Sequence, residues 1–301
     1  MTDVLTLGET MGAFRAAGPF RLGGTAELTV AGAESNVAIG LARLGHAVRW
    51  TGVTGADEIG SLVRRTLLAE QVDVQAARIT PDASTGLILF EPRTADITRV
   101  LYYRRGSAGS RLSVEDVRRA FDLGVPRIVH VTGITPALSE SALAAVTEAI
   151  DLGRQAGSTV SLDVNFRSKL WTAAQAAETL RPLLENVDVL IASDDELPIA
   201  GDHEVPEVVV KHGADGATVH AQSRSWSAEA HRVTVADTTG AGDAFVAGYL
   251  SARLDGLEPG DRVRRGNAVA AFAVATPGDW QGLPTRTDLE LLDLQAGSTV
   301  R

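Results

Sequence analysis

The chain has 301 residues, of which 45% are hydrophobic, and its formal net charge at pH 7 is −10. This length and apolar fraction suffice for one large α/β core with a small appendage, and no disulfide is needed to stabilise it. The absence of cysteine excludes a thiolate nucleophile and a cysteine-ligated zinc or iron–sulfur centre, and the acidic balance argues against nucleic acid as a partner.

The N-terminus shows no pattern of a secretory leader. Val4–Leu7 reads as a short first strand, and Asp3 stands where a basic segment would be expected. The strongest apolar stretch, from Ala268 to Ala275, is too short to cross a membrane. We therefore expect a soluble cytoplasmic protein without a membrane partner.

Short β-branched runs alternate with amphipathic stretches, such as Leu138–Gly157 and Ala173–Leu184, along most of the chain. The runs that we predict to be buried strands are Val4–Leu7, Val48–Val53, Ile128–Val131, Thr159–Asp163, Val189–Ala192 and Val208–Lys211. This alternation predicts an α/β fold with a mostly parallel sheet and helices on both faces. Ligands of such sheets bind at the carboxyl ends of the strands, where Arg167, Ser193 and Lys211 fall.

Two segments, Arg21–Val30 and Thr85–Tyr103, interrupt this alternation. They are rich in Thr, Val, Leu and Tyr and lack helical spacing, and the second contains a turn-like run from Glu91 to Asp96. We expect them to form a separate small sheet. It would be built from insertions at residues 10–31 and 85–110 into a single domain that spans residues 1–301.

The run from Asp237 to Phe245 is the most informative part of the chain. Gly240, Ala241 and Gly242 give a backbone that can turn its N–H groups inward, and an apolar helical pattern follows directly. A loop that feeds a helix N-terminus binds anions.

Asp243 would repel an anion, so in such a loop it makes sense as a base. It would take the proton of a substrate hydroxyl while the three N–H groups stabilise charge on a transferring phosphoryl group. The alternative is that Asp243 only caps its helix, and this loop alone does not decide between the two. No P-loop or protein-kinase motif occurs, which excludes those two kinase classes.

A second informative run, Gly-Ala-Glu-Ser-Asn-Val-Ala, begins at Gly32. Gly32 allows a ligand to approach the backbone closely, and Asn36 can cap a helix or bind a sugar hydroxyl. The runs at Gly32 and Asp237, in this order, resemble the two signatures of the ribokinase-like (PfkB) carbohydrate kinases. The resemblance implies a three-layer α/β/α sandwich with a mostly parallel central sheet. It also implies a small β-sheet lid that closes over the sugar and makes a homo-oligomer contact.

Three further runs narrow the resemblance to 2-keto-3-deoxygluconate kinases. They begin at Tyr102 (YYRRGSAGS), His130 (HVTGITPAL) and Ser161 (SLDVNFR). Arg104 and Arg167 have a physical rationale there, because a planar guanidinium group binds the carboxylate of a sugar acid through two parallel hydrogen bonds. Isolated arginines are otherwise commonly on solvated faces. The expected reaction is phosphorylation of the terminal hydroxyl of 2-keto-3-deoxygluconate by ATP.

The resemblance also implies which residues bind each ligand. On the sugar side they are Gly32, Ala33, Asn36, Ile88, Tyr102, Arg104, Arg167 and Asp279. On the nucleotide side they are Asn165, Ser193, Lys211, Gly213, Gly216, Gly240, Gly242 and Asn267. Mg²⁺ would be positioned by Glu196 and, through water, by Asn165. A monovalent cation is an additional candidate cofactor.

Some residues depart from the family pattern. Ser193 stands where many relatives carry Asn, and Ile88 stands where close relatives can carry Tyr. The stretch from Leu197 to Glu207 is short for the helical connection usual there, which predicts an abbreviated peripheral helix. Two other functions stay open from the sequence: a kinase for another sugar, such as fructose, ribose or a nucleoside, and a non-catalytic protein that binds sugar acids.

Overall fold

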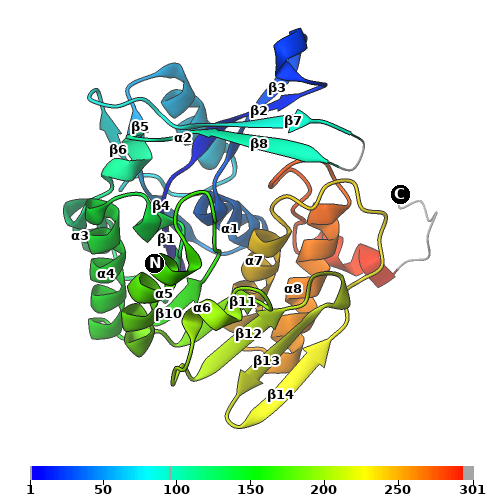
Figure 1. Cartoon of the computed structure of the whole chain (residues 1–301). Helices are drawn as coiled ribbons and strands as arrows, with labels where there is room; N and C mark the ends of the chain where they lie inside the picture. Colours follow the sequence, from blue (N-terminus) through cyan, green and yellow to red (C-terminus); the bar gives the residue numbers. More distant parts are fainter. Residues whose placement is uncertain (1, 95–96, 294–301) are drawn as a thin grey trace.

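The computed structural model in Figure 1 describes residues 2–94 and 97–293. Most neighbouring strands of its large central sheet are parallel, and an antiparallel hairpin of the last two strands closes one edge. In spatial order the eight strands are β14 (Arg224–Ala228), β13 (Ala217–Ala221), β12 (Glu207–Lys211), β11 (Val189–Ser193), β10 (Thr159–Asp163), β9 (Ile128–Thr132), β1 (Val4–Leu7) and β4 (Val48–Thr51). The prediction of a mostly parallel sheet is confirmed.

Helices cover both faces of this sheet (Figure 1). One face carries α1 (Ala33–Arg43), α7 (Ala241–Leu254) and α8 (Pro259–Val274), and the other carries α3 (Val114–Asp122), α4 (Glu140–Gln155) and α5 (Ala173–Leu180). In β11, Val189 and Ile191 pack into the first core cluster, whereas Leu190 and Ala192 pack into the second. Successive side chains of a strand point to opposite faces, so a continuous apolar run requires cover on both sides.

A smaller sheet stands apart from the central one, at the top of Figure 1. Its strand order is β3 (Ala26–Ala31), β2 (Met11–Ala16), β7 (Leu87–Pro92) and β8 (Thr98–Tyr103), and α2 (Glu58–Ala69) lies beside its base. Met11, Ala13 and Ile88 belong to a separate core cluster on one face of this sheet. The smaller sheet therefore has an apolar face of its own.

The run Val48–Val53 is not the single strand that we predict from the sequence. It divides at Gly52 into β4 and β5 (Val53–Gly55), and β5 pairs with β6 (Arg78–Thr80) in a separate two-stranded sheet. A Cβ atom at Gly52 would overlap the Trp50 ring and the Gly8 carbonyl oxygen. The chain passes too close to its neighbours here for any residue but glycine, and it changes direction.

The predicted strand Arg21–Val30 is wrong at its start. Phe20–Leu22 forms a single 3-10 turn, and Gly23 and Gly24 follow with φ angles of 73° and 112°. Such angles end an extended conformation, so β3 begins only at Ala26.

The connection between β11 and β12 is short, as the sequence predicts. The stretch from Leu197 to Glu207 carries only α6 (Leu197–Ala200), a helix of 4 residues. Ala95 and Asp96 of the predicted turn between β7 and β8 lie outside the described residues. No helix in the described part of the chain is long and apolar enough to span a bilayer.

Candidate active site

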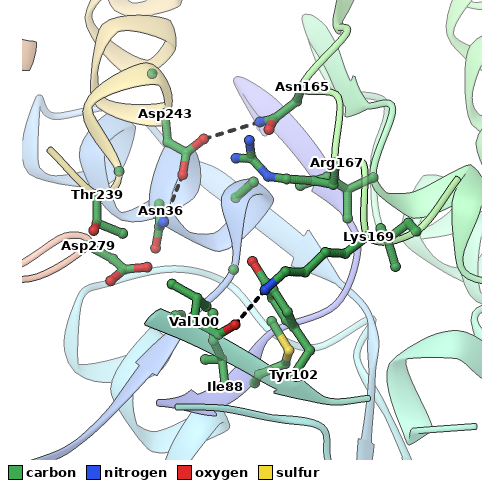
Figure 2. Close-up of a pocket in the computed structure, with 18 of the residues that line it drawn as sticks. Asn36, Ile88, Val100, Tyr102, Asn165, Arg167, Lys169, Thr239, Asp243 and Asp279 are labelled. Carbon is green, nitrogen blue, oxygen red and sulfur yellow. Dashed lines mark hydrogen bonds between the residues drawn. The ribbon is translucent and has the colours of Figure 1, made fainter. Parts of the chain in front are cut away.

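A cavity of about 1130 Å³ opens between the carboxyl edge of the central sheet and the smaller sheet. Its walls include the first turns of α1 and α7, the loop that follows β10, and strands β7 and β8. Figure 2 shows several of these side chains converging from distant parts of the sequence. Loops and helix N-termini meet at this edge because the parallel strands end there.

Asp243 lies in the first turn of α7 and is 6% exposed. Its Oδ2 accepts a hydrogen bond from Asn36 Nδ2 at 2.8 Å, and its Oδ1 accepts one from Asn165 Nδ2 at 3.4 Å (Figure 2). Burial raises the pKa of Asp243 to about 7, against the opposing effects of Asn36 and Arg167. Its partners belong to other elements, which argues against the alternative that it only caps its own helix. A carboxylate with this pKa is suited to accept a proton near neutral pH.

Gly240 is the N-cap residue just before α7, and its backbone lies in the left-handed region, with φ 76°. A Cβ atom on Gly240 would overlap the Asp279 carbonyl oxygen, so both the turn and the close contact require glycine. Gly242 differs, because a Cβ atom there would meet only Lys211 Nζ, at 3.6 Å. Ala241 N–H donates to the Thr238 carbonyl at 3.3 Å. One of the three predicted N–H donors is therefore engaged inside the turn.

Arg104 is paired inside the protein. Its Nε and a terminal nitrogen lie 2.6 and 2.5 Å from Glu9 Oε2, and the Arg104 and Glu9 side chains are 9% and 1% exposed. Ser107 Oγ also donates to Glu9. Gly32 lies against the same loop, since a Cβ there would come within 2.5 Å of the Glu9 carbonyl oxygen. The charge of Arg104 is thus neutralised before any ligand binds.

Arg167 lines the same cavity and is exposed. Its only hydrogen bond within the described ranges is a long one of 3.5 Å, donated to the Phe166 carbonyl. Figure 2 shows its guanidinium group reaching toward Asp243, and its charge lowers the pKa of that carboxyl. Arg167 is therefore a cation in the cavity with its hydrogen-bonding capacity largely unused.

Lys169 approaches the cavity from the same loop. Its Nζ donates to the Val100 carbonyl of β8 at 2.5 Å and lies 5.3 Å from the centre of the Tyr102 ring (Figure 2). Ile88 and Tyr102 face this cavity from neighbouring positions of β7 and β8. The loop after β10 thus touches the smaller sheet across the cavity.

Asp279 lies at the opposite wall and is 6% exposed. It is paired with Arg15 of β2, and Arg15 also contacts Asp237 at 2.8 Å. Burial raises the pKa of Asp279, while Arg15 opposes that rise. The Asp279 carboxylate is accordingly held by the smaller sheet.

On the nucleotide side, Lys211 ends β12 and donates to both oxygens of Asp163, at 2.8 and 2.9 Å. Burial raises the pKa of Asp163, and Lys211 counteracts this. Gly213 lines the cavity, but Gly216 and Asn267 do not. A Cβ at Gly216 would overlap the Ala228 carbonyl, and the Asn267 amide donates to the carbonyls of Ala228 and Glu229 at 2.9 and 3.1 Å. In this structure these two residues fasten the chain after β14.

Glu196 links two loops at the cavity wall. Its Oε1 accepts from Phe166 N–H at 2.7 Å, and its Oε2 accepts from Ser193 N–H at 2.9 Å. Each oxygen keeps one further acceptor site. No group of three His, Cys, Asp or Glu side chains in residues 2–94 and 97–293 is placed to hold a metal ion. The free acceptor sites of Glu196 fit an Mg²⁺ ion that is held through its water ligands.

Sequence reasoning missed three residues that line the cavity, Glu9, Glu34 and Lys169. It also missed Arg15, which lies outside the lining and pairs with Asp279. Glu34 is 1% exposed, and its Oε1 accepts from the hydroxyls of Thr132 and Thr135, both at 2.6 Å. Burial raises its pKa. The position of Glu34 inside the run at Gly32 was an available signal, whereas nothing in the local sequence marks Glu9 or Arg15.

Comparisons with known proteins give matches over nearly the whole chain. Residues 1–286 match the family model of the pfkB family carbohydrate kinases. The 2-dehydro-3-deoxygluconokinases of Bacillus subtilis (strain 168) and Thermoproteus tenax are 36% and 33% identical to the chain, over 95% and 97% of it and 94% of each relative. The crystal structure of a PfkB protein from Polaromonas sp. JS666 is 34% identical, with a TM-score of 0.86, and the match covers 96% of this chain and 99% of that one.

Proposed function

The chain belongs to the pfkB family of carbohydrate kinases, and from this premise we propose that it phosphorylates the terminal hydroxyl of 2-keto-3-deoxygluconate with ATP. One observation carries the proposal. The buried base Asp243 and the exposed guanidinium of Arg167 face the same cavity. The first suits an alcohol acceptor, and the second suits a carboxylate on the same small molecule.

The chemistry follows from the first turn of α7. The terminal hydroxyl of the sugar acid would lie against Asp243 and give its proton to that carboxylate as the hydroxyl oxygen forms a bond to the γ-phosphorus. The bond from this phosphorus to the oxygen that bridges the β- and γ-phosphates breaks, and ADP leaves. Asn36 and Asn165 hold the two carboxylate oxygens of the base in orientation. The N–H of Gly242, at a helix N-terminus, faces the charge that develops on the phosphoryl oxygens. The ammonium group of Lys211, which is paired with Asp163, lies beside this glycine and can donate a hydrogen bond to a phosphoryl oxygen there.

The nucleotide would lie along the ends of β11 and β12, near Ser193, Lys211 and Gly213. Mg²⁺ neutralises charge on the nucleotide phosphates when it is bound. Glu196 and Asn165 would hold its water ligands. The role of Asn267 and Gly216 in nucleotide binding stays a prediction. Both residues lie outside the cavity lining, so they would act by fixing the position of the chain after β14. Dependence on a monovalent cation is tested by comparing turnover in potassium and choline salts.

A panel assay of ADP release with sugar acids and neutral sugars tests the proposed substrate. We expect the wild type to prefer 2-keto-3-deoxygluconate, and Arg167→Ala to lower kcat/KM for the acid by about 10- to 100-fold. The loss for a neutral sugar should be small. Arg118→Ala is the matched control, since Arg118 is an exposed arginine paired with Glu148 outside the cavity.

Two results would overturn the proposal. Faster turnover of fructose, ribose or a nucleoside than of any sugar acid would indicate a kinase for a neutral substrate. Binding of the sugar acid without ADP release would indicate a protein that binds sugar acids but does not catalyse phosphorylation. Both are measured in the same panel, with calorimetry for binding.

The smaller sheet supports two further parts of the proposal. We infer that it acts as a lid that excludes water from the phosphoryl group, and that its outer face forms a homo-oligomer contact. Phe14, Leu28 and Leu89 share that face by register, and Leu101 and Tyr103 lie on it as well. Leu28 and Tyr103 are 46% and 63% exposed. A contiguous exposed apolar face on a sheet is typical of an interface.

Light scattering after size exclusion tests this contact. We expect an oligomer for the wild type and a monomer for Leu28→Glu. Leu123→Glu is the control, because Leu123 is also exposed, at 43%, but follows α3. A monomeric wild type at micromolar concentration would contradict the proposal.

A further inference from the structure

Arg15 joins the smaller sheet to the loop that precedes α7. It lies on β2, and its side chain is 18% exposed. One terminal nitrogen contacts Asp237 Oδ2 at 2.8 Å, and the other contacts Asp279. The guanidinium carbon lies 4.1 Å from the centre of the Phe90 ring of β7. Arg15 is therefore held by its own sheet and reaches two carboxylates outside it.

Asp237 fixes the shape of the loop that ends at Gly240. Its Oδ1 accepts from the backbone N–H and the hydroxyl of Thr239, at 2.9 and 2.7 Å. Its Oδ2 accepts from Gly278 N–H at 3.3 Å. Although burial acts in the other direction, the bonds from Thr239 hold the pKa of Asp237 below its ordinary value. Asp237 therefore connects Arg15 to the turn that leads into α7.

Asp279 provides a second connection to the same turn. Its carbonyl oxygen lies so close to Gly240 that a Cβ would overlap it, and Figure 2 shows its side chain beside Thr239. The neighbouring residues Trp280 and Gln281 donate to the Val30 carbonyl and the Thr29 hydroxyl of β3, at 3.0 and 2.9 Å. The segment from Asp279 to Gln281 therefore contacts the smaller sheet on one side and Gly240 on the other.

We propose that Arg15 is a positioning residue that couples the smaller sheet to the turn at Thr239 and Gly240, which would face the transferring phosphoryl group. Through this coupling, a sugar bound under the sheet would raise the affinity for the nucleotide. The inference rests on the proposed function for the identity of the two ligands. When the smaller sheet closes over the sugar, Arg15 moves with the sheet and shifts the two carboxylates that it binds, Asp237 and Asp279. These two residues contact Thr239 and Gly240 and so change the position of the turn.

Charge makes the arginine necessary for this coupling. Asp237 and Asp279 carry like charges and contact the same guanidinium group, so they repel each other. A nearby nucleotide and a sugar acid add more negative charge. One guanidinium group can bind both carboxylates through its fork of donors, whereas an ammonium group acts as a single point charge. A lysine at this position would hold one carboxylate and release the other.

Calorimetry of a non-hydrolysable ATP analogue, with and without the sugar that the wild type turns over, tests the coupling. We expect the sugar to tighten analogue binding in the wild type by about 5- to 150-fold. In Arg15→Met this factor should fall close to 1, and Arg15→Lys should restore part of it. The control is Arg43→Met. Arg43 holds the same segment through the carbonyls of Trp280, Gln281 and Leu283, but it lies on α1 and not on the smaller sheet.

Hydrogen exchange of the ligand-free enzyme gives a readout that needs no sugar. Arg15→Met should speed exchange of the Thr239 amide, which donates to Asp237, while Arg43→Met should leave it near the wild-type rate. Unfolding curves show whether each variant is folded. If Arg15→Met does not fold, the same two measurements are made with Arg15→Lys. Unchanged coupling and exchange in Arg15→Met, or equal losses in Arg43→Met, would overturn the inference. Failure of the wild type to release ADP with any sugar acid would instead count against the proposed function.

Discussion

Asn36 donates a hydrogen bond from Nδ2 to Oδ2 of Asp243 across 2.8 Å, although the two residues are 207 positions apart. They lie in the first turns of α1 and α7, which pack on the same face of the central sheet. The Oδ1 atom of Asn36 is buried and has no protein partner in the described part of the chain. The amide therefore orients one oxygen of the base and leaves an acceptor for a ligand hydroxyl.

Asp243→Asn should lower kcat by about 10²–10⁴-fold, because the amide keeps the shape of the side chain but cannot accept the proton. The Kd of the sugar and of the nucleotide should change little. Steady-state ADP release and calorimetry measure the two effects. A variant with normal turnover would remove Asp243 as the base.

The pH profile of kcat/KM should report the base. Because burial raises the pKa of Asp243 to about 7, activity should rise with pH through that value as the carboxyl loses its proton. Asn36→Leu removes a hydrogen bond that favours the charged form, so its acid limb should move to higher pH. Activity measured from acidic to alkaline pH decides this, with Asn186→Leu as a control at an exposed amide outside the cavity. An acid limb at the ordinary pKa of an aspartate in the wild type would contradict the assignment.

Gly240→Ala and Gly242→Ala should fail in different ways. The first forces a Cβ into the left-handed region and onto the Asp279 carbonyl, so we expect a loss of at least about 1 kcal/mol in the free energy of unfolding. The second meets only Lys211 Nζ, at an ordinary contact distance of 3.6 Å, so stability should hold while the methyl group crowds the phosphoryl site and lowers kcat. Urea unfolding and ADP release measure both variants. Equal stability of the two would show that the Gly240 contact is not rigid.

Arg104→Met should destabilise the fold, by about 3–5 kcal/mol, because it leaves the Glu9 carboxylate buried without its partner. Glu9→Gln combined with Arg104→Met should recover part of that loss, since the uncompensated charge is gone. Arg167→Met is the matched control. Its guanidinium is exposed and makes no ion pair within the described residues, so its stability should stay near that of the wild type. Chemical unfolding of the four proteins tests this, and a fully stable Arg104→Met variant would contradict it.

Much of the fold could be predicted because its cause is local. The predicted strand Val189–Ala192 is a continuous apolar run, and in the structure its side chains are buried on both faces of the sheet. The errors in the predicted strands occurred where a residue distant in the sequence determines the local conformation. Gly52 breaks a strand because the Trp50 ring and the Gly8 carbonyl occupy the space beside it, and no pattern within Val48–Val53 shows that packing.

The amino-acid sequence by itself determined the fold class, because glycine turns, helix starts and strand ends are set by neighbouring residues. It also offered Asp243, Asn36 and Arg167 as site candidates, through their motifs and the family resemblance that those motifs carry. Only the tertiary structure decided which charges are already paired. Arg104 is bound by Glu9 and Asp279 by Arg15, while Arg167 lies exposed in the cavity. An ion pair depends on the distance between two side chains, and for residues far apart in the chain that distance exists only after the sheets and helices have packed.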